Sequence, residues 1–238
     1  MAGSIAVKSL YKNYGALKVI SNWNMNINGG EKIALLGPSG SGKTTFLRLI
    51  AGLEPPSSGE ITISTTKIGF VFQEPRLIPW RSVSDNLLFV NEHGHADAIL
   101  SKLRLCGFEN YFPSQLSGGM QQRVNLARAM MIDPDLLIMD EAFSSLDLNI
   151  KLDIITDIVS QCEERQLTMI TVTHDLKEAL LLADRIFIIS NSPARILHEF
   201  PVDLQPHARN IANPQLLSLE AQLLPLMLGT RHSLSLKP

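Results

Sequence analysis

The sequence is poor in cysteine, in aromatic residues and in excess charge of one sign. Its 238 residues contain 2 cysteines, Cys106 and Cys162, which are too few for a disulfide framework and suit a reducing cytosol. The formal net charge is -2 and no long basic run occurs, so the composition does not favour binding to nucleic acid.

Long hydrophobic runs are also missing. No stretch reaches the roughly 18 consecutive apolar residues of a membrane-spanning helix, because Asp184 and Arg185 interrupt the most apolar candidate. The N-terminal segment MAGSIAVKSL lacks the basic start and apolar block of a signal peptide. We therefore expect a protein that does not cross a membrane by itself, although it can lie against one.

Short apolar runs alternate with amphipathic segments along the chain. Buried strands are expected to begin at Lys32, Ile68, Leu136, Met169 and Arg185, with helices over residues 42–51, 118–131, 149–165 and 175–182. Several of the runs are apolar throughout, which is typical of parallel strands covered on both faces. The alternation predicts an α/β fold with a mixed, mainly parallel core sheet.

Three segments depart from this alternation of apolar strands and amphipathic helices. Residues 5–27 indicate strands that form a small antiparallel sheet with the segment GEITIS from Gly59, and residues 74–133 indicate a mostly helical insertion. After about residue 192 the pattern weakens, residues 200–215 are loop-like, and the next segment is an apolar helix that Pro225 is expected to break.

These segments predict one domain over residues 1–238. Residues 1–73 and 134–200 form its core, which includes the antiparallel part, residues 74–133 form a helical subdomain, and residues 201–238 form a C-terminal tail.

A glycine-rich loop follows the first apolar strand and leads into a helix. It reads GPSGSGKT and, with the next threonine, comprises Gly37, Pro38, Ser39, Gly40, Ser41, Gly42, Lys43, Thr44 and Thr45. Glycines let backbone N–H groups approach phosphates closely, and the helix start adds a positive dipole end. The lysine can reach the β- and γ-phosphates of a nucleotide, and Thr44 can bind Mg²⁺. The stretch therefore predicts a phosphate-binding loop.

Two carboxylates stand at the end of another apolar strand, LLIMDE. Asp140 is expected to hold Mg²⁺ through water, and Glu141 to orient or deprotonate the attacking water. Both assignments depend on the phosphate loop, because an acidic strand end by itself commonly just begins a loop.

A second anion-binding helix start occurs in the stretch LSGGMQQR. Ser117 is a good N-cap, and Gly118 and Gly119 leave N–H groups uncovered by side chains. The first loop already encloses its own nucleotide, so the economical interpretation is that this second site serves the nucleotide of another copy. Two chains facing head-to-tail would then bury two ATP molecules.

With these motifs in this order, the chain resembles the ABC-transporter ATPase family over nearly its whole length. The stretch LSGGMQQRVNLARAM is similar to the signature motif of that family, which adds Gln121 to the residues expected to act on a partner's nucleotide. The resemblance implies a P-loop NTPase fold, ATP and Mg²⁺ as ligands, and a homodimer that forms with ATP.

The resemblance assigns four further positions. Tyr14 is similar to the aromatic residue that stacks on adenine, with Tyr11 as the alternative and packing on the small sheet as the competing structural interpretation of Tyr14. Gln73 is similar to the glutamine that senses Mg²⁺ and the attacking water, and His174 to the histidine that contacts the γ-phosphate. The stretch SSLD, with Ser145 and Asp147, is similar to the loop that crosses the dimer interface.

The expected chemistry is ATP hydrolysis that loosens a closed dimer. Lys43, Gln73, Glu141 and His174 form the expected catalytic set, and Thr44, Gln73 and Asp140 the expected Mg²⁺ set. Catalysis of this kind is mostly positioning and charge stabilisation.

One stretch points to a transporter subgroup. VFQEPRLIPWRSVSDNL is similar to ATPases of nitrate, sulfonate and taurine importers, and precursor importers of the thiamine type share the pattern. Leu77, Ile78, Pro79 and Trp80 are then either exposed contacts for a membrane permease or core residues of the helical subdomain, and composition does not separate the two.

This resemblance implies a peripheral protein at the cytoplasmic face of the cell membrane. Its partners would be transmembrane permease subunits and, indirectly, a periplasmic or surface substrate-binding protein, with no nucleic acid. Two other classes compete: a soluble ABC ATPase outside transport, which usually carries long coiled-coil insertions or two cassettes, and a non-hydrolytic switch, which would lack the catalytic set.

Overall fold

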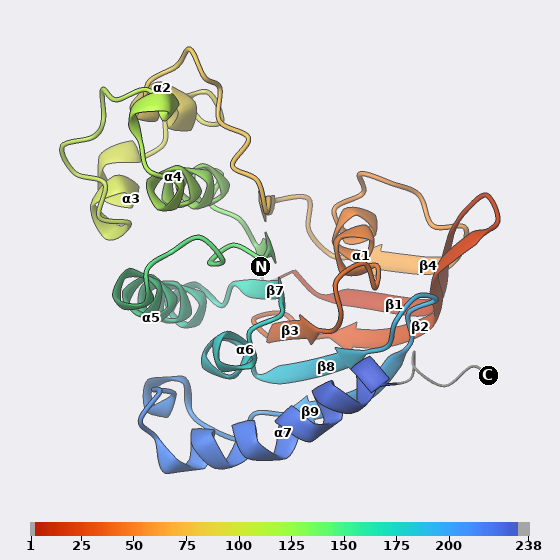
Figure 1. The fold of residues 1–238 in the computed structure, drawn as a ribbon. Helices are drawn as coiled ribbons and strands as arrows, with labels where there is room; N and C mark the ends of the chain where they lie inside the picture. Colours follow the sequence, from red (N-terminus) through yellow and green to blue (C-terminus); the bar gives the residue numbers. More distant parts are fainter. Residues whose placement is uncertain (1–2, 233–238) are drawn as a thin grey trace.

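A six-stranded mixed sheet forms the centre of the structure, a computed structural model that describes residues 3–232 (Figure 1). In spatial order its strands are β5 (Ile68–Val71), β6 (Leu136–Asp140), β7 (Thr168–Thr173), β3 (Lys32–Leu36), β8 (Arg185–Ile189) and β9 (Ile196–Pro201). The first five are parallel, and β9 pairs antiparallel with β8 at the edge. The five strands predicted for this sheet are confirmed.

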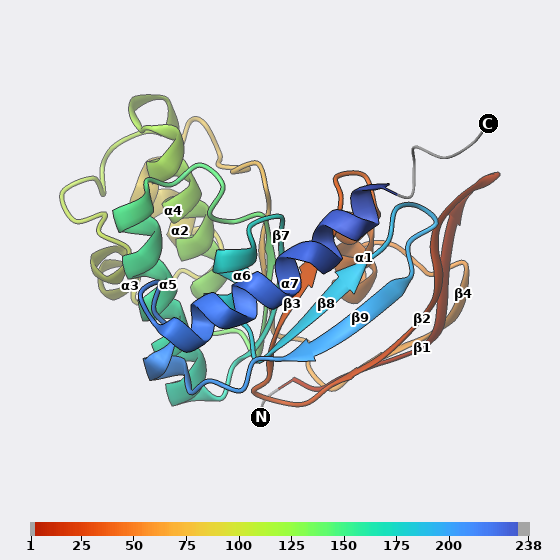
Figure 2. The same ribbon diagram turned by 60° about the horizontal axis from the view of Figure 1, so that its bottom comes forward.

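The apolar strands of this sheet are covered on both faces. In β3, Ile33 and Leu35 join one buried cluster while Ala34 and Leu36 join the other, because successive side chains of a strand point to opposite faces. Helices α5 (Leu148–Arg165) and α6 (Leu176–Leu182) cover one face, and α1 (Lys43–Ile50) covers the other. The turned view in Figure 2 shows the same layers.

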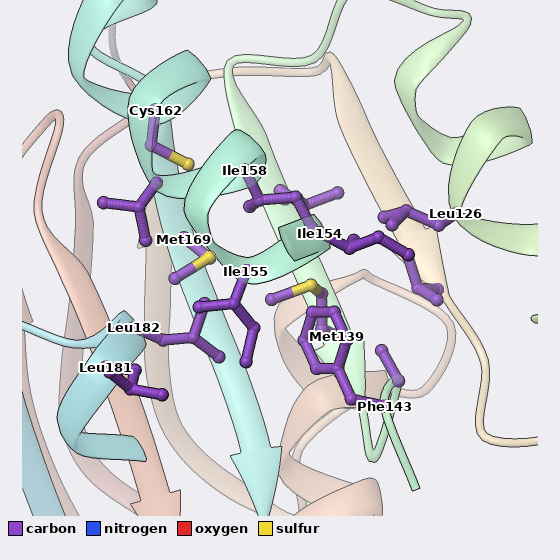
Figure 3. Packing of buried hydrophobic residues seen from close by; sticks show 14 of the residues in the cluster. Leu126, Met139, Phe143, Ile154, Ile155, Ile158, Cys162, Met169, Leu181 and Leu182 are labelled. Atoms are coloured by element: carbon purple, nitrogen blue, oxygen red, sulfur yellow. The ribbon is translucent and has the colours of Figure 1, made fainter. Parts of the chain in front are cut away.

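The packing between α5 and the sheet is close. Figure 3 shows Ile154, Ile155 and Ile158 of α5 against Met139 of β6 and Met169 of β7. All five side chains are buried, and Ile158 follows Ile154 and Ile155 by four and three residues on one face of α5. This core anchors α5 to the strand ends that carry the candidate site.

A second, three-stranded sheet lies beside α1. It is antiparallel, in the order β2 (Leu17–Ile27), β1 (Ile5–Tyr14), β4 (Ser58–Ile63), as predicted for residues 5–27 and the segment from Gly59. Trp23 of β2 is fully buried with its ring centroid 4.8 Å from that of Phe46 in α1. The small sheet therefore shares its core with the phosphate-loop helix.

The insertion between β5 and β6 is less helical than expected. It contains α2 (Val83–Leu88), α3 (Ala96–Lys102), the short helix η1 (Pro113–Gln115) and α4 (Gly118–Met130). Loops connect the first three, so the expectation of a mostly helical segment holds fully only for α4. Val124 and Leu126 of α4 join the core that extends to α5, and this contact ties the insertion to the sheet.

Two expectations about the C-terminal region were wrong. Strand β9 was not predicted, and its last two residues were expected as loop, because an edge strand with the sequence ILHEFP carries only a weak pattern. After the short helix η2 (Pro206–Ala208), helix α7 (Pro214–His232) continues through Pro225.

Packing explains why Pro225 does not end α7. Proline in a helix interior removes one backbone hydrogen bond, but Leu216 and Leu223 of the same helix are buried in the core. Pro225 itself is exposed, so its ring meets solvent and not a packed neighbour. Tertiary burial outweighs the local penalty, and within residues 3–232 no helix is long and apolar enough to span a membrane.

Candidate functional site

The candidate site lies where the carboxyl ends of β3, β5, β6 and β7 meet. Side chains that follow parallel strands gather at one edge of a sheet, which is the usual binding edge of an α/β protein. The phosphate loop follows β3, Gln73 follows β5, Asp140 ends β6, and His174 follows β7. The fold therefore brings together residues that are up to 137 positions apart.

The phosphate loop has the backbone geometry that its glycines predict. Gly40 and Gly42 have positive φ values of 74° and 95°, and Gly42 is the N-cap of α1. The Lys43 ammonium donates to the carbonyl oxygens of Gly37 and Pro38, each at 2.8 Å. Burial lowers the pKa of Lys43, against the attraction of Glu141 and Asp140. The buried Ser41 hydroxyl has no hydrogen-bond partner among residues 3–232.

Asp140 and Thr44 fit a Mg²⁺ ion bound together with phosphate. Asp140 is 3% exposed, and its Oδ1 atom has no hydrogen-bond partner in the described part of the chain. Burial raises the pKa of Asp140, and a hydrogen bond with Thr44 partly offsets this effect. Both residues line a cavity of about 210 Å³ together with Gln73, Arg48 and other residues. An unpartnered buried carboxylate oxygen beside a hydroxyl is a suitable donor set for a hard cation.

The protein alone does not supply a complete metal cage. Among residues 3–232 no group of three or more His, Cys, Asp or Glu side chains could hold a metal ion.

Glu141 lies between the glutamine and the histidine predicted to act with it. Its Oε2 atom accepts a hydrogen bond from Gln73 Nε2 at 3.3 Å and lies 3.5 Å from His174 Nδ1. Glu141 has a positive φ of 47°, which is uncommon for a residue with a side chain. The three side chains form a polar cluster that can hold and activate a water molecule.

Tyr14 lies next to the phosphate-loop helix and not in the small sheet's core. Its ring is 44% exposed, its hydroxyl donates to Glu54, and it interacts with Thr45 of α1. The Lys12 ammonium lies 4.8 Å from the ring centroid. Tyr11 instead lines a separate cavity with Ser21, Asn22 and other residues. The structure therefore places Tyr14 in contact with the phosphate-loop helix.

The second helix start has the expected cap. Ser117 is the N-cap of α4, and its hydroxyl accepts from the Met120 N–H group at 3.3 Å. Gly118 faces open space, since a Cβ atom there would meet nothing within 4 Å. In both ribbon views α4 lies with α2 and α3, apart from α1 (Figures 1 and 2). Gln121 differs from its neighbours, because its amide donates to the Pro113 carbonyl at 3.0 Å and holds the preceding loop.

The predicted interface loop lies against this helix start. A Cβ atom on Gly119 would come within 3.2 Å of the Ser145 carbonyl oxygen, so a side chain there would displace the loop. Ser145 and Asp147 are exposed, and Asp147 is the N-cap of α5. The residues predicted to face a partner therefore lie on an accessible surface.

The stretch from Leu77 to Trp80 contains both kinds of residue that were considered. Leu77 packs against the core, and Ile78 is half-buried. Trp80 is 78% exposed, and the insertion also exposes Phe89 and Phe112. Core packing and an exposed apolar surface thus coexist in this stretch.

Sequence reasoning missed Glu54, Arg48 and Arg76. Glu54 holds the Tyr14 hydroxyl from 40 positions away, and the two arginines line the cavity with Thr44. None of them stands in a recognisable motif, so only the folded arrangement identifies them.

Comparison with known proteins finds one family. The profile of the family described as "ABC transporter" matches residues 20–144. The aliphatic sulfonates import ATP-binding protein SsuB 2 of Pseudomonas syringae pv. tomato is 38% identical over 217 residues, covering 90% of this chain and 93% of that protein. SsuB of Corynebacterium glutamicum is 38% identical over 227 residues, covering 92% and 91%.

Solved structures agree with the fold. The dimeric ATP-binding cassette MJ0796, in a post-hydrolysis state bound to ADP and Pi, superposes with a TM-score of 0.77. It is 31% identical, and the match covers 84% of this chain and 100% of that one. The predicted fold class is therefore confirmed.

Proposed function

Because the chain belongs to the ABC transporter family and is an ATPase of the ABC type, we propose that it is the ATP-hydrolysing subunit of a membrane importer for aliphatic sulfonates. The contact of Glu141 with both Gln73 and His174, beside the phosphate loop, carries the catalytic part of this proposal. The names of the most similar relatives support the substrate class.

Each residue of the site has a role in this proposal. The phosphate-loop amides and Lys43 bind the β- and γ-phosphates, and Tyr14 stacks on the base. Thr44, Asp140 and Gln73 hold Mg²⁺, which when bound neutralises charge on the phosphates. Glu141 orients and deprotonates the attacking water, and His174 donates to the γ-phosphate.

A second copy completes the site in this proposal. Ser117, Gly118 and Gly119 of the partner offer a helix N-terminus to the γ-phosphate, and the loop with Ser145 and Asp147 lies in the same interface. The accessible position of these residues supports this arrangement. Closure with ATP and opening after hydrolysis would then move a permease, since the two nucleotide states differ in contacts across the interface.

The first test is turnover by the purified protein. A Glu141→Gln change should lower phosphate release by roughly 10²- to 10⁴-fold, because it removes the general base. Binding of ATP should persist, since the phosphate loop is unchanged. Equal turnover by both proteins would refute the assignment of Glu141.

The second test addresses the permease. Trp80→Ala should weaken co-purification with the permease and leave basal turnover unchanged, because Trp80 is exposed on the insertion and outside the nucleotide site. Leu224→Ala on α7 is the matched control, since Leu224 is also an exposed apolar residue. Equal loss in both variants would speak against a specific permease surface at Trp80.

The third test addresses the substrate. The complete transporter should take up a labelled alkanesulfonate in an ATP-dependent manner, whereas nitrate and thiamine precursors should not compete. Uptake of a thiamine precursor in its place would retain the importer and replace the substrate class.

A further inference from the structure

Lys151 of α5 makes two close ion pairs with the start of α6. Its ammonium lies 2.7 Å from Asp175 Oδ2 and 2.8 Å from Glu178 Oε2. The Lys151 side chain is 14% exposed and that of Glu178 is 2% exposed, so this pair is buried, whereas the Asp175 side chain is 39% exposed. Neither the sequence motifs nor the proposed function assigns a role to Lys151 or Glu178.

The cluster connects the two segments that lead into the site. On one side, Lys151 belongs to the first turn of α5, where its N–H donates to the Asp147 carbonyl at 2.8 Å. Asp147 ends the interface loop. On the other side, Asp175 directly follows His174, and the Asp175 N–H donates to the Thr173 hydroxyl at 3.1 Å. His174 is therefore held between the end of β7 and the residue that Lys151 binds.

Asp175 also fixes the start of α6. Its Oδ1 atom accepts from the N–H groups of Lys177 and Glu178, at 3.0 and 3.3 Å, and thus caps the helix. One carboxylate therefore serves the helix cap with one oxygen and Lys151 with the other. This leaves the main chain on the C-terminal side of His174 little freedom, whereas the imidazole itself is 60% exposed.

The charges of the cluster depend on one another. Burial lowers the pKa of Lys151, but the hydrogen bonds with Asp175 and Glu178 outweigh burial and leave the pKa above its ordinary value. Burial raises the pKa of Glu178, despite its bond with Lys151. Removing only Lys151 or only Glu178 would leave a buried charge without compensation, so the test replaces these two residues together.

We propose that Lys151 is a positioning residue that holds the interface loop and His174 in a fixed relation to each other. This inference rests on the proposed function, in which His174 acts on the γ-phosphate and the interface loop contacts the partner. Without the cluster, α5 and α6 could shift separately, and the two elements would no longer reach their catalytic positions together. The phosphate loop lies elsewhere, so ATP binding should be spared.

The test is a charge-balanced replacement, Lys151→Met with Glu178→Leu. We expect kcat for ATP hydrolysis to fall by about tenfold and KM to stay within about twofold, because positioning for the chemical step changes while ground-state binding does not. Asp175→Asn is the second variant, since asparagine keeps the helix cap and loses the charge. Lys151→Arg should retain most of kcat, because it keeps both the charge and the donors.

Lys177→Met is the control, because Lys177 is an exposed neighbour whose nearest carboxylate, Glu220, lies 3.9 Å away. Unchanged kcat in both the balanced pair and Asp175→Asn, with melting temperatures like that of the unaltered protein, would overturn the inference alone. If the balanced pair does not fold, the kcat of the Asp175→Asn protein alone tests the inference, and an unchanged kcat overturns it. Absence of Glu141-dependent turnover in the unaltered protein would overturn the proposed function together with this inference.

Discussion

At the scale of single residues, the site places charged groups where folding alone disfavours them. Asp140 and Lys43 are both buried, and burial shifts the pKa of each toward the neutral form. These side chains are therefore poorly placed for stability and well placed to bind a charged ligand. Such a conflict is typical of functional sites.

Asp140→Asn should stabilise the protein without nucleotide and abolish Mg²⁺-dependent turnover. Because folding raises the pKa of Asp140, its ionised form destabilises the fold. This penalty is absent below the pKa of an unfolded aspartate and is complete above the raised, folded pKa. At pH 8 we expect the melting temperature to rise by about 2–4 °C, which corresponds to roughly 1 kcal/mol for a chain of this size.

The measurement is thermal unfolding at pH 8 and near pH 3 in the absence of nucleotide. The difference between Asp140→Asn and the unaltered protein should shrink at the acidic pH. A destabilised variant at pH 8 would show that the Thr44 hydrogen bond matters more than burial of the charge.

Tyr14→Ala should weaken ATP binding by roughly 10- to 100-fold. Base-aromatic stacking contributes about 1–3 kcal/mol per base, and Tyr14 is exposed beside the phosphate-loop helix. Isothermal titration with ADP measures the effect, because ADP carries the same base and is not hydrolysed during the measurement. Tyr11→Ala is the control, and weaker binding in that variant instead would transfer the stacking role to Tyr11.

At the scale of elements, the junction between β5 and α4 depends on the absence of a side chain. A Cβ atom on Gly69 of β5 would lie 2.6 Å from the Ala129 carbonyl oxygen of α4, which a backbone cannot easily avoid. This close approach connects the insertion to the sheet edge that carries Gln73.

Gly69→Ala should therefore lower the free energy of unfolding by about 1–3 kcal/mol through overpacking. Gly229→Ala in α7 is the matched control, because a Cβ atom there meets nothing within 4 Å. It should stabilise the helix by up to about 1 kcal/mol. Chemical denaturation of both variants gives the comparison, and an equally stable Gly69→Ala protein would show that α4 can move away from β5.

At the scale of the whole molecule, the phosphate loop and the α4 N-terminus lie in different parts of one chain (Figures 1 and 2). Each has the geometry of an anion site, and only one has the catalytic cluster beside it. A head-to-tail pair would join the two kinds of site. A substitution at Gly118 can test this arrangement.

Gly118→Asp should prevent the ATP-driven dimer of a Glu141→Gln protein while leaving the fold intact. The added carboxylate is favourable at a helix N-terminus and meets no neighbour, yet it repels a triphosphate. Size-exclusion chromatography with light scattering should show a dimer with ATP for Glu141→Gln, and a monomer when Gly118→Asp is added. Gly118→Asn is the neutral control of similar size.

If Gly118→Asp dimerises with ATP as well as its control does, α4 does not face a nucleotide across the interface. An unchanged melting temperature in both variants would exclude a folding defect as the explanation of a lost dimer.

Most of the secondary structure and the gathering of the candidate site residues at one sheet edge could be predicted from the sequence, because both depend on local patterns. The roles of these residues stay predictions. The apolar runs of β3, β6 and β7 and the glycine loop before Lys43 are each contained in a few consecutive residues. Their order along the chain also placed Asp140, Gln73 and His174 at strand ends, where parallel strands present their ligands. Assembly with a partner and the division into subdomains stay predictions.

Contacts between distant segments were decided only by the tertiary structure. The helix through Pro225, the edge strand β9, the Glu54–Tyr14 contact and the Lys151 cluster all depend on packing that no local pattern encodes. The physical reason is one of range. Propensity, capping and loop geometry act over a few residues of chain, whereas burial and charge pairing act between whatever the fold brings within a few ångströms.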